Sequence, residues 1–181
     1  MIKDKVSINI ISSFNHANFI GLLGNNNDFK WQINDGNYNQ IFQILSDRKL
    51  NIWKKKSDIS LIWSTPESIS PEFKKLLNHE KANKNIIKKD IDFFFNCLRT
   101  VKKNSDIILI PNWILREPNE SSIALSFSKK LGIEYHLSYM NYYLSELMNK
   151  EKNFYLLNST KWLTNCGSEA TYNSKLWYLM K

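Results

Sequence analysis

Four short apolar runs, rich in Ile and Leu, recur along the chain, and each ends in small polar residues. The runs cover 6–11, 58–63, 106–110 and 154–157. Runs of this length and composition are typical of strands that are buried on both faces. Segments with helical spacing of apolar residues separate them, and the longest covers 86–103. Strands that alternate with helices predict an α/β fold with a mostly parallel sheet.

Weaker patterns fill the spaces between these elements. Alternating apolar and polar residues at 29–33 predict a half-exposed edge strand, and 58–63 is expected to be central, with Pro66 ending regular structure after it. Segment 111–132 has no clear period and predicts a long crossover. The other expected helices or helical turns are 16–23 (with Asn15 as N-cap), 38–45, 73–77 and 139–148. Trp162, Leu163 and the segment 172–180 are expected to pack as a C-terminal tail or helix. Without a repeat or linker, we expect a single domain over 1–181.

Composition narrows the classes of function. The chain is 43% hydrophobic, which is typical of a globular protein, and no apolar stretch is long enough for a membrane span. The net charge of +8 suggests binding to nucleic acid. However, only three of the 25 basic residues are arginines, and specific recognition of nucleic acid relies on the arginine guanidinium, so the composition argues against it. Cys97 and Cys166 have no metal-ligand spacing, and no signal peptide precedes the first strand. We therefore expect a cytoplasmic protein without a metal or a cofactor.

Parallel sheets bind ligands beyond the carboxyl ends of their strands. The candidate site therefore consists of the residues that end or follow the four runs. Ser12 and Ser13 are candidate nucleophiles, although both are equally candidates for capping the first helix. The remaining candidates, for oxyanion stabilisation or ligand binding, are Trp63, Ser64, Thr65, Asn112, Trp113 and Asn158. Core packing is the alternative interpretation for both tryptophans.

The order of these landmarks resembles the SGNH-hydrolase-like region at the N-terminus of FkbH-like proteins. The closing stretch Tyr172–Lys181 is similar to the Tyr-Asp-x-Arg-Leu-Trp-Tyr-x-x-Lys pattern of that family. The resemblance implies a three-layer α/β/α sandwich of the flavodoxin-like, SGNH type. It also implies that full-length relatives continue into a haloacid-dehalogenase-like domain. That domain is associated with loading a glyceryl unit onto a carrier protein in polyketide or related biosynthesis.

The catalytic chemistry that the resemblance implies is incomplete in this sequence. An SGNH hydrolase needs a serine after the first strand and a C-terminal Asp-x-x-His pair. One register places Ser13 at the nucleophile position, and the other places Phe14 there. The tail has no histidine, and Asn158 and Asn173 stand where relatives carry Asp near the ends.

The remaining histidines and loop acids are the only other sources of a base. His16 is expected to be an exposed surface group and His136 a partly buried, hydrogen-bonded side chain. Asp35 and Glu67 are expected to be solvated loop charges. A complete triad therefore requires His16 or His136 to replace the missing tail histidine.

The leading hypothesis is an SGNH-like domain with a degraded triad that binds or positions an acyl, glyceryl or sugar-linked group, free or on a carrier protein. One alternative is a residual esterase or acyl transferase with Ser13 as nucleophile. A second alternative is a docking module for a downstream domain or a carrier protein, which predicts an exposed apolar patch around Trp162 and Trp177.

Overall fold

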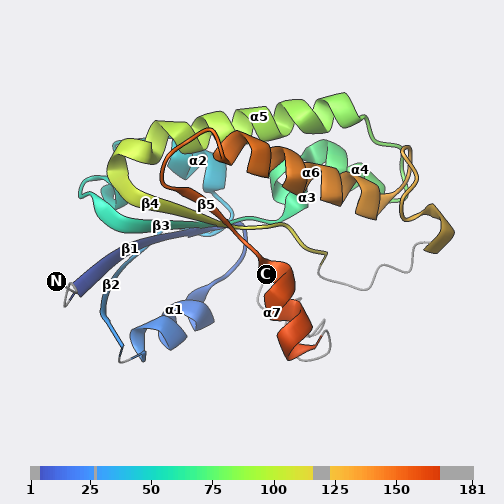
Figure 1. Cartoon of the computed structure of the whole chain (residues 1–181). Coiled ribbons are helices and arrows are strands. Elements are labelled where there is room, and N and C mark those ends of the chain that lie inside the picture. Colours follow the sequence, from blue (N-terminus) through green and yellow to red (C-terminus); the bar gives the residue numbers. More distant parts are fainter. Residues whose placement is uncertain (1–4, 27, 116–122, 168–181) are drawn as a thin grey trace.

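A five-stranded parallel sheet forms the centre of the protein. The computed structural model describes residues 5–26, 28–115 and 123–167. The sheet order is β2-β1-β3-β4-β5, so β3 is central and β2 is an edge, as the sequence predicts (Figure 1). All four pairs of neighbouring strands are parallel. The strands are β1 (Lys5–Ser12), β2 (Lys30–Asp35), β3 (Ser57–Trp63), β4 (Ser105–Pro111) and β5 (Phe154–Leu157).

Helices cover both faces of this sheet, and the predicted three-layer α/β/α architecture is confirmed (Figure 1). One face carries α1 (Ala17–Gly24) and α7 (Ser159–Cys166). The other face carries α2 (Ile41–Ser46), α3 (Pro66–Ile69), α4 (Pro71–Leu77), α5 (Lys84–Val101) and α6 (Ile133–Met148). Short 3₁₀ turns lie at Asn51–Trp53, Lys102–Asn104 and Ile123–Leu125. None of the helices in the described ranges has the length and apolarity that crossing a bilayer would take.

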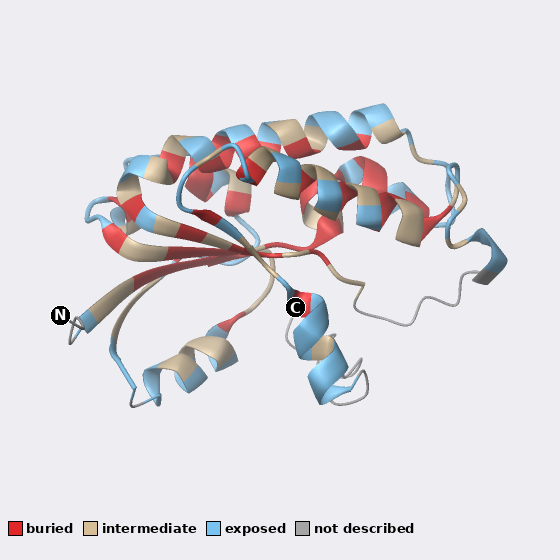
Figure 2. Ribbon diagram, in the orientation of Figure 1, coloured by how far each residue is buried: buried red, intermediate tan, exposed pale blue. Residues whose placement is uncertain are grey.

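The hydrophobic core is divided unequally between the two faces. The main cluster lies on the α2–α6 face, where Phe73, Phe94 and Leu98 have no exposed surface. The second cluster has only Ile8, Ile10 and Leu61 as buried members. Figure 2 shows the same contrast, because buried positions are dense in the upper helices and sparse in α1 and α7. Strand residues reach both clusters because successive side chains point to opposite faces of a sheet.

Two elements differ from the sequence-based expectation. Pro66 begins α3 and does not end regular structure, because proline fits the first turn of a helix. Thr65 caps that helix, with its side chain accepting from Ser68 N and Ser68 Oγ reaching back to Thr65 N. Helix α6 begins at Ile133, earlier than the predicted 139. Trp162 and Leu163 of the predicted C-terminal tail or helix lie in α7. Its segment 172–180 lies outside the described residues, as does part of the predicted crossover over 111–132.

Candidate functional site

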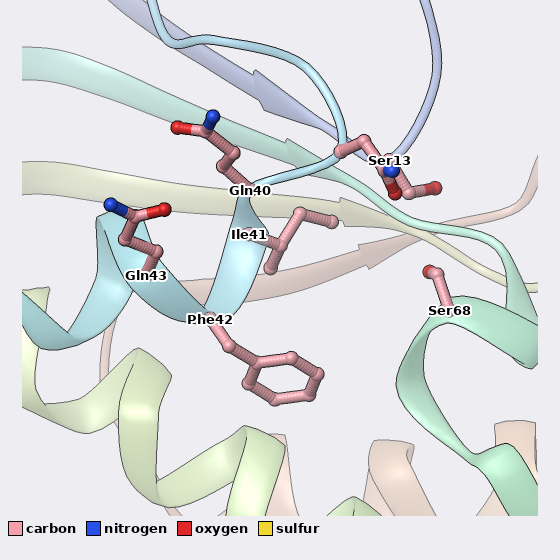
Figure 3. Close-up of a pocket in the computed structure, with 7 residues that line it drawn as sticks. Ser13, Gln40, Ile41, Phe42, Gln43 and Ser68 are labelled. Atoms are coloured by element: carbon pink, nitrogen blue, oxygen red, sulfur yellow. The ribbon is translucent and has the colours of Figure 1, made fainter. Parts of the chain in front are cut away.

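The two candidate serines after β1 have different surroundings. Ser12 is fully buried, whereas Ser13 is half-buried and lines a pocket (Figure 3). The alternation along the strand explains this difference. Ile10 and Ile11 already belong to opposite core clusters, so Ser12 continues toward the α1 side and Ser13 toward the α2 side. Neither hydroxyl caps α1, since its N-cap position has no side-chain hydrogen bond.

The pocket beside Ser13 is small and uncharged. Its volume is about 180 Å³, and its walls come from the loops after β1 and β2, the first turn of α2, and α3. Figure 3 shows Ser13, Ser68 and Phe42 around one opening. Its lining residues are Ser13, Asn39, Gln40, Ile41, Phe42, Gln43 and Ser68. Hydroxyls and amides that flank apolar side chains can hydrogen-bond a small neutral group.

Thr65 links the serine to the neighbouring strand end. Its backbone N–H donates to Ser13 Oγ over 3.0 Å, and Ser13 N donates to Trp63 O over 3.1 Å. The second bond continues the parallel pairing of β1 and β3 beyond the strands. The Ser13 hydroxyl is therefore held at the carboxyl edge with a backbone donor beside it, which is where the sequence places the site.

The buried Ser12 takes part in a chain of side-chain hydrogen bonds that the sequence interpretation did not find. Ser12 Oγ lies 2.7 Å from His16 Nδ1, and His16 Nε2 lies 2.6 Å from Asp35 Oδ1. The prediction that His16 is an exposed group is wrong, because its exposed fraction is 5%. The Asp35 side chain is 58% exposed, yet it accepts the His16 hydrogen bond and is no free loop charge. The register brings these residues together, since Ile10 pairs with Asp35.

This Ser12–His16–Asp35 chain has the connectivity of a catalytic triad but a closed geometry. A nucleophilic serine must present its oxygen to a substrate. Ser12 Oγ has no exposed surface, and its own hydroxyl donates to Phe14 O two residues further on. Phe14 O also lies 3.2 Å from His16 Nδ1. These contacts stabilise the turn that follows β1. The accessible Ser13 has no histidine partner in the described ranges.

The other two histidines lie elsewhere. His136 is fully buried, more than the expected partial burial, and its Nε2 contacts Lys129 O over 3.1 Å. Burial lowers the pKa of His136, with the nearby Lys84 charge acting in the same direction. His79 is an exposed residue in the left-handed backbone region, with a φ of 61°. Neither residue replaces the tail histidine at Ser13.

Ser64 and Trp113 form a structural contact in the core. Trp113 is 1% exposed, and its Nε1 donates to Ser64 Oγ over 2.8 Å. Asn141 fixes the backbone of the same residue, accepting from Trp113 N over 2.8 Å and donating to Trp113 O over 2.7 Å. Of the two interpretations of Trp113, core packing is therefore the one the structure supports.

The remaining candidates lie beside β5 or on the thin face of the sheet, which is the face that α1 and α7 cover. Asn112 Oδ1 accepts from Ser159 N, and Asn158 Oδ1 accepts from Lys161 N as the N-cap of α7. Trp63 packs edge-on against the rings of Phe14, Phe19 and Trp162. None of these three candidates is among the pocket-lining residues.

Sequence reasoning missed the part of the pocket that comes from the β2–α2 loop and α3. Asn39 has a φ of 59°, a conformation that asparagine tolerates better than most residues, and it follows Gly36 in a turn cluster. Ser68 is the N3 residue of a capping box that begins at Thr65. Both signals are local turn and cap chemistry. They place the residues in loops but not on the wall of a shared pocket.

The fold and the carboxyl-edge site define a parallel α/β domain with flavodoxin-like strand order. A family model described as FkbH, N-terminal domain, matches residues 10–181, and the chain belongs to this family. The FkbH-like part of the sequence resemblance is thereby confirmed. A comparison with curated proteins gave no match.

A solved structure also resembles this chain. It is the crystal structure of the N-terminal part of the protein BF1531 from Bacteroides fragilis, containing a phosphatase domain and complexed with Mg. The two are 14% identical with a TM-score of 0.72, which shows a shared fold. The similarity covers 97% of this chain and 46% of that chain, so this chain spans about half the length of its structural relative. In the described part of this chain, no group of three His, Cys, Asp or Glu residues is placed to hold a metal ion.

Proposed function

We propose that this chain is an SGNH-hydrolase-like domain with a degraded catalytic triad that binds a small acyl, glyceryl or sugar-linked group in the Ser13 pocket. The observation that carries the proposal is a half-buried Ser13 hydroxyl in an uncharged, concave pocket, with its hydrogen bond made by a backbone N–H and not by an imidazole. Family membership supports the context of polyketide or surface-polysaccharide-type biosynthesis, with the group free or linked to a carrier protein.

The chemistry of the pocket walls supports binding of a neutral group. Ser13 offers a hydroxyl that donates and accepts, and Asn39, Gln40 and Gln43 offer amides that do the same. Ser68 offers only an acceptor oxygen, because its hydroxyl donates to Thr65 O over 2.7 Å. Phe42 and Ile41 supply apolar contact. No charged side chain lines the pocket, so a phosphate or a free carboxylate would lose its hydration without a counter-charge. A thioester or ester of a small hydroxylated acid meets both conditions.

A titration with a defined probe tests this proposal. The probe is the N-acetylcysteamine thioester of glyceric acid, added to ¹⁵N-labelled protein and followed by backbone amide shifts. We expect saturable shifts at Ser13, Thr65 and Ser68, and at least roughly ten-fold weaker binding in Ser13→Ala, because a buried hydrogen bond is lost. The matched control is Ser138→Ala, an exposed serine on α6. Shifts that avoid the pocket, or equal affinities in both variants, would contradict the proposal.

A residual hydrolase is the second candidate function, and the Ser12–His16–Asp35 chain is the observation that favours it. In that case a fluorophosphonate would label Ser12 or Ser13 stoichiometrically. The protein would also release p-nitrophenol from p-nitrophenyl acetate, with both activities lost in the matching alanine variant. We expect no stoichiometric labelling, since Ser12 is buried and Ser13 lacks a histidine partner in the described ranges.

Docking of a phosphatase-type domain or a carrier protein is favoured by one further observation. Trp162 of α7 is 46% exposed and packs against the partly buried Trp63 on the thinly covered face. The second predicted member of this patch, Trp177, lies outside the described residues. If α7 is a docking surface, adding an acyl carrier protein in its holo form should shift and shield the Trp162 indole resonance, whereas that of the buried Trp113 stays in place.

A further inference from the structure

Two separate loops contribute to the Ser13 pocket beside α2 and α3, and the structure joins these loops at several points. Ser13 lies on the loop after β1, and Asn39 and Gln40 lie on the loop after β2. Asn39 N donates to Ser12 O over 2.9 Å, which links the second loop directly to the last residue of β1, next to Ser13. This bond holds Asn39 beside the strand end from which Ser13 continues.

The side chain of His16 makes the second link. Its Nδ1 contacts Ser12 Oγ over 2.7 Å, in the turn that carries Ser13, and its Nε2 donates to Asp35 Oδ1 over 2.6 Å, at the end of β2. The imidazole is 95% buried, so its contacts are made out of bulk water. Hydrogen bonds to a charged partner are about twice as strong as neutral ones. The ring therefore bridges the roots of both loops.

The residue after Asp35 shows how closely the second loop approaches. Gly36 N donates to Ile10 O over 2.9 Å. A Cβ added at Gly36 would lie 3.2 Å from that carbonyl and 3.1 Å from Ile44 Cδ1. The loop that leads to Asn39 thus starts close against β1, with little space for a side chain at Gly36. The His16–Asp35 contact lies one residue earlier, at the end of β2.

We propose that His16 is a positioning residue for the Ser13 pocket, holding the loop of Ser13 against the loop of Asn39 and Gln40 through its hydrogen bond to Asp35. The proposal rests on the proposed function for what the pocket binds. In this role His16 removes no proton from a substrate, since it is buried and both of its ring nitrogens already face protein partners, Ser12 Oγ and Asp35 Oδ1. It also does not cap α1, although it occupies the N-cap position.

The variants that test this role are His16→Ala, Asp35→Ala, Asp35→Asn and the double variant of His16→Ala with Asp35→Ala. The control is His79→Ala, which removes an exposed histidine. The first measurement needs no ligand: hydrogen exchange of the Asn39 amide, which donates to Ser12 O. We expect faster exchange in His16→Ala and in Asp35→Ala, no further increase in the double variant, and an intermediate rate in Asp35→Asn, which keeps an acceptor oxygen.

The second measurement is the titration with the N-acetylcysteamine thioester of glyceric acid. We expect roughly ten-fold weaker binding in His16→Ala and in Asp35→Ala, and unchanged binding in His79→Ala. In the wild-type protein the ring ¹⁵N signals of His16 should shift as the probe binds, whereas those of His79 should not. If His16 merely stabilised α1, His16→Ala would lower the unfolding free energy, but the ring signals of His16 in the wild-type protein would not respond to the probe.

The outcomes separate the two proposals. If the probe does not bind wild-type protein but Asn39 exchange follows the His16 and Asp35 variants, the proposed ligand is wrong and the clamp between the loops stands. If the probe binds and neither Asn39 exchange nor affinity changes in His16→Ala, the positioning role is overturned and the proposed function stands. Additive effects in the double variant would also overturn it, because the two side chains would then act independently.

Discussion

The two faces of the sheet differ in how completely they are covered. On the α2–α6 face, α5 alone buries seven residues, and Phe94 at its centre has no exposed surface. On the other face, α1 buries no residue, and α7 buries only Ser159. Since apolar area removed from water is the main source of stability, the first face holds the fold together. The second face is free to carry polar contacts and exposed aromatic rings.

This division places the site at the boundary between the two faces. Ser13 opens toward the well-packed side, where α2 and α3 supply rigid walls. Ser12 and His16 lie toward the thin side, where a buried polar network displaces little apolar packing. Rigid support with a polar junction is what a binding site requires, since its groups must be held in place by neighbours. If the packing determines stability in this way, substitutions on the two faces should differ in their cost.

The largest effect is expected from truncating the same residue type on each face. Phe94→Ala should lower the unfolding free energy by about 3–5 kcal/mol, because it leaves a cavity between Phe42 and Trp113. Phe19→Ala in α1 removes a partly buried ring that touches Trp63 and should cost about 1–2 kcal/mol. Urea denaturation followed by circular dichroism measures both. Equal losses would show that the thin face carries as much stability as the main core.

The next largest effect concerns the Trp113–Ser64 hydrogen bond on the α2–α6 face. Trp113→Phe should cost about 2–3 kcal/mol, because it leaves the buried Ser64 hydroxyl without its donor and removes part of a buried ring. Ser64→Ala alone should cost about 1–2 kcal/mol. The double variant should cost less than the sum of the two, since the same bond is lost twice. Additive losses would mean that the indole N–H contributes nothing through Ser64.

A smaller effect on the same face depends on pH. Hydrogen bonding to Lys75 holds the pKa of Glu72 below its ordinary value of 4.5, and the Asn83 N–H acts in the same direction. A carboxyl group with a lowered pKa in the folded state contributes stability above its unfolded pKa. That contribution is lost as pH falls below about 4.5 and through the folded value.

The matching variant isolates this carboxylate. Glu72→Gln should flatten the fall in unfolding free energy between neutral pH and about pH 3, while lowering stability at pH 7 by less than Trp113→Phe does. Denaturant titrations at several pH values measure the slope. Glu134→Gln, in the first turn of α6, serves as the control. Identical pH slopes for wild type and Glu72→Gln would contradict the assignment.

Much of the fold could be predicted because a strand that is buried on both faces of the sheet needs a continuous apolar run in the sequence. The runs that became β1, β3, β4 and β5 are continuous and apolar, and α5 has apolar residues at helical spacing over eighteen positions. The weaker expectations failed where local chemistry departs from periodicity. Pro66 starts a helix that lacks an apolar period, and α6 places the polar His136 on its buried side, which hides its true start.

The candidate site could be predicted only in part. Parallel topology places polar residues at the carboxyl edge, and Ser13 and Thr65 do meet there. Sequence alone does not give the register that sets Asp35 level with Ile10, so the contact between His16 and a carboxylate 19 residues away was not foreseen. Asn39, Gln40 and Ser68 enter the pocket through the path of loops. Hydrophobic patterning says nothing about that path.

The smallest change in stability is expected at the outer aromatic residue of the thin face. Trp162 is 46% exposed, and its contact with Trp63 is an edge-on pair with centroids 6.2 Å apart. Trp162→Ala should lower the unfolding free energy by no more than about 1 kcal/mol, since such pairs contribute about 0.5–1.5 kcal/mol and half of the ring already faces water. Tyr142→Ala on α6, where the side chain is 66% exposed, is the matched control and should cost still less. Denaturation of both variants in the isolated chain measures the difference. A loss at Trp162 as large as that of Phe94→Ala would show that α7 is an integral part of the core, and the contrast between the two faces would then fail.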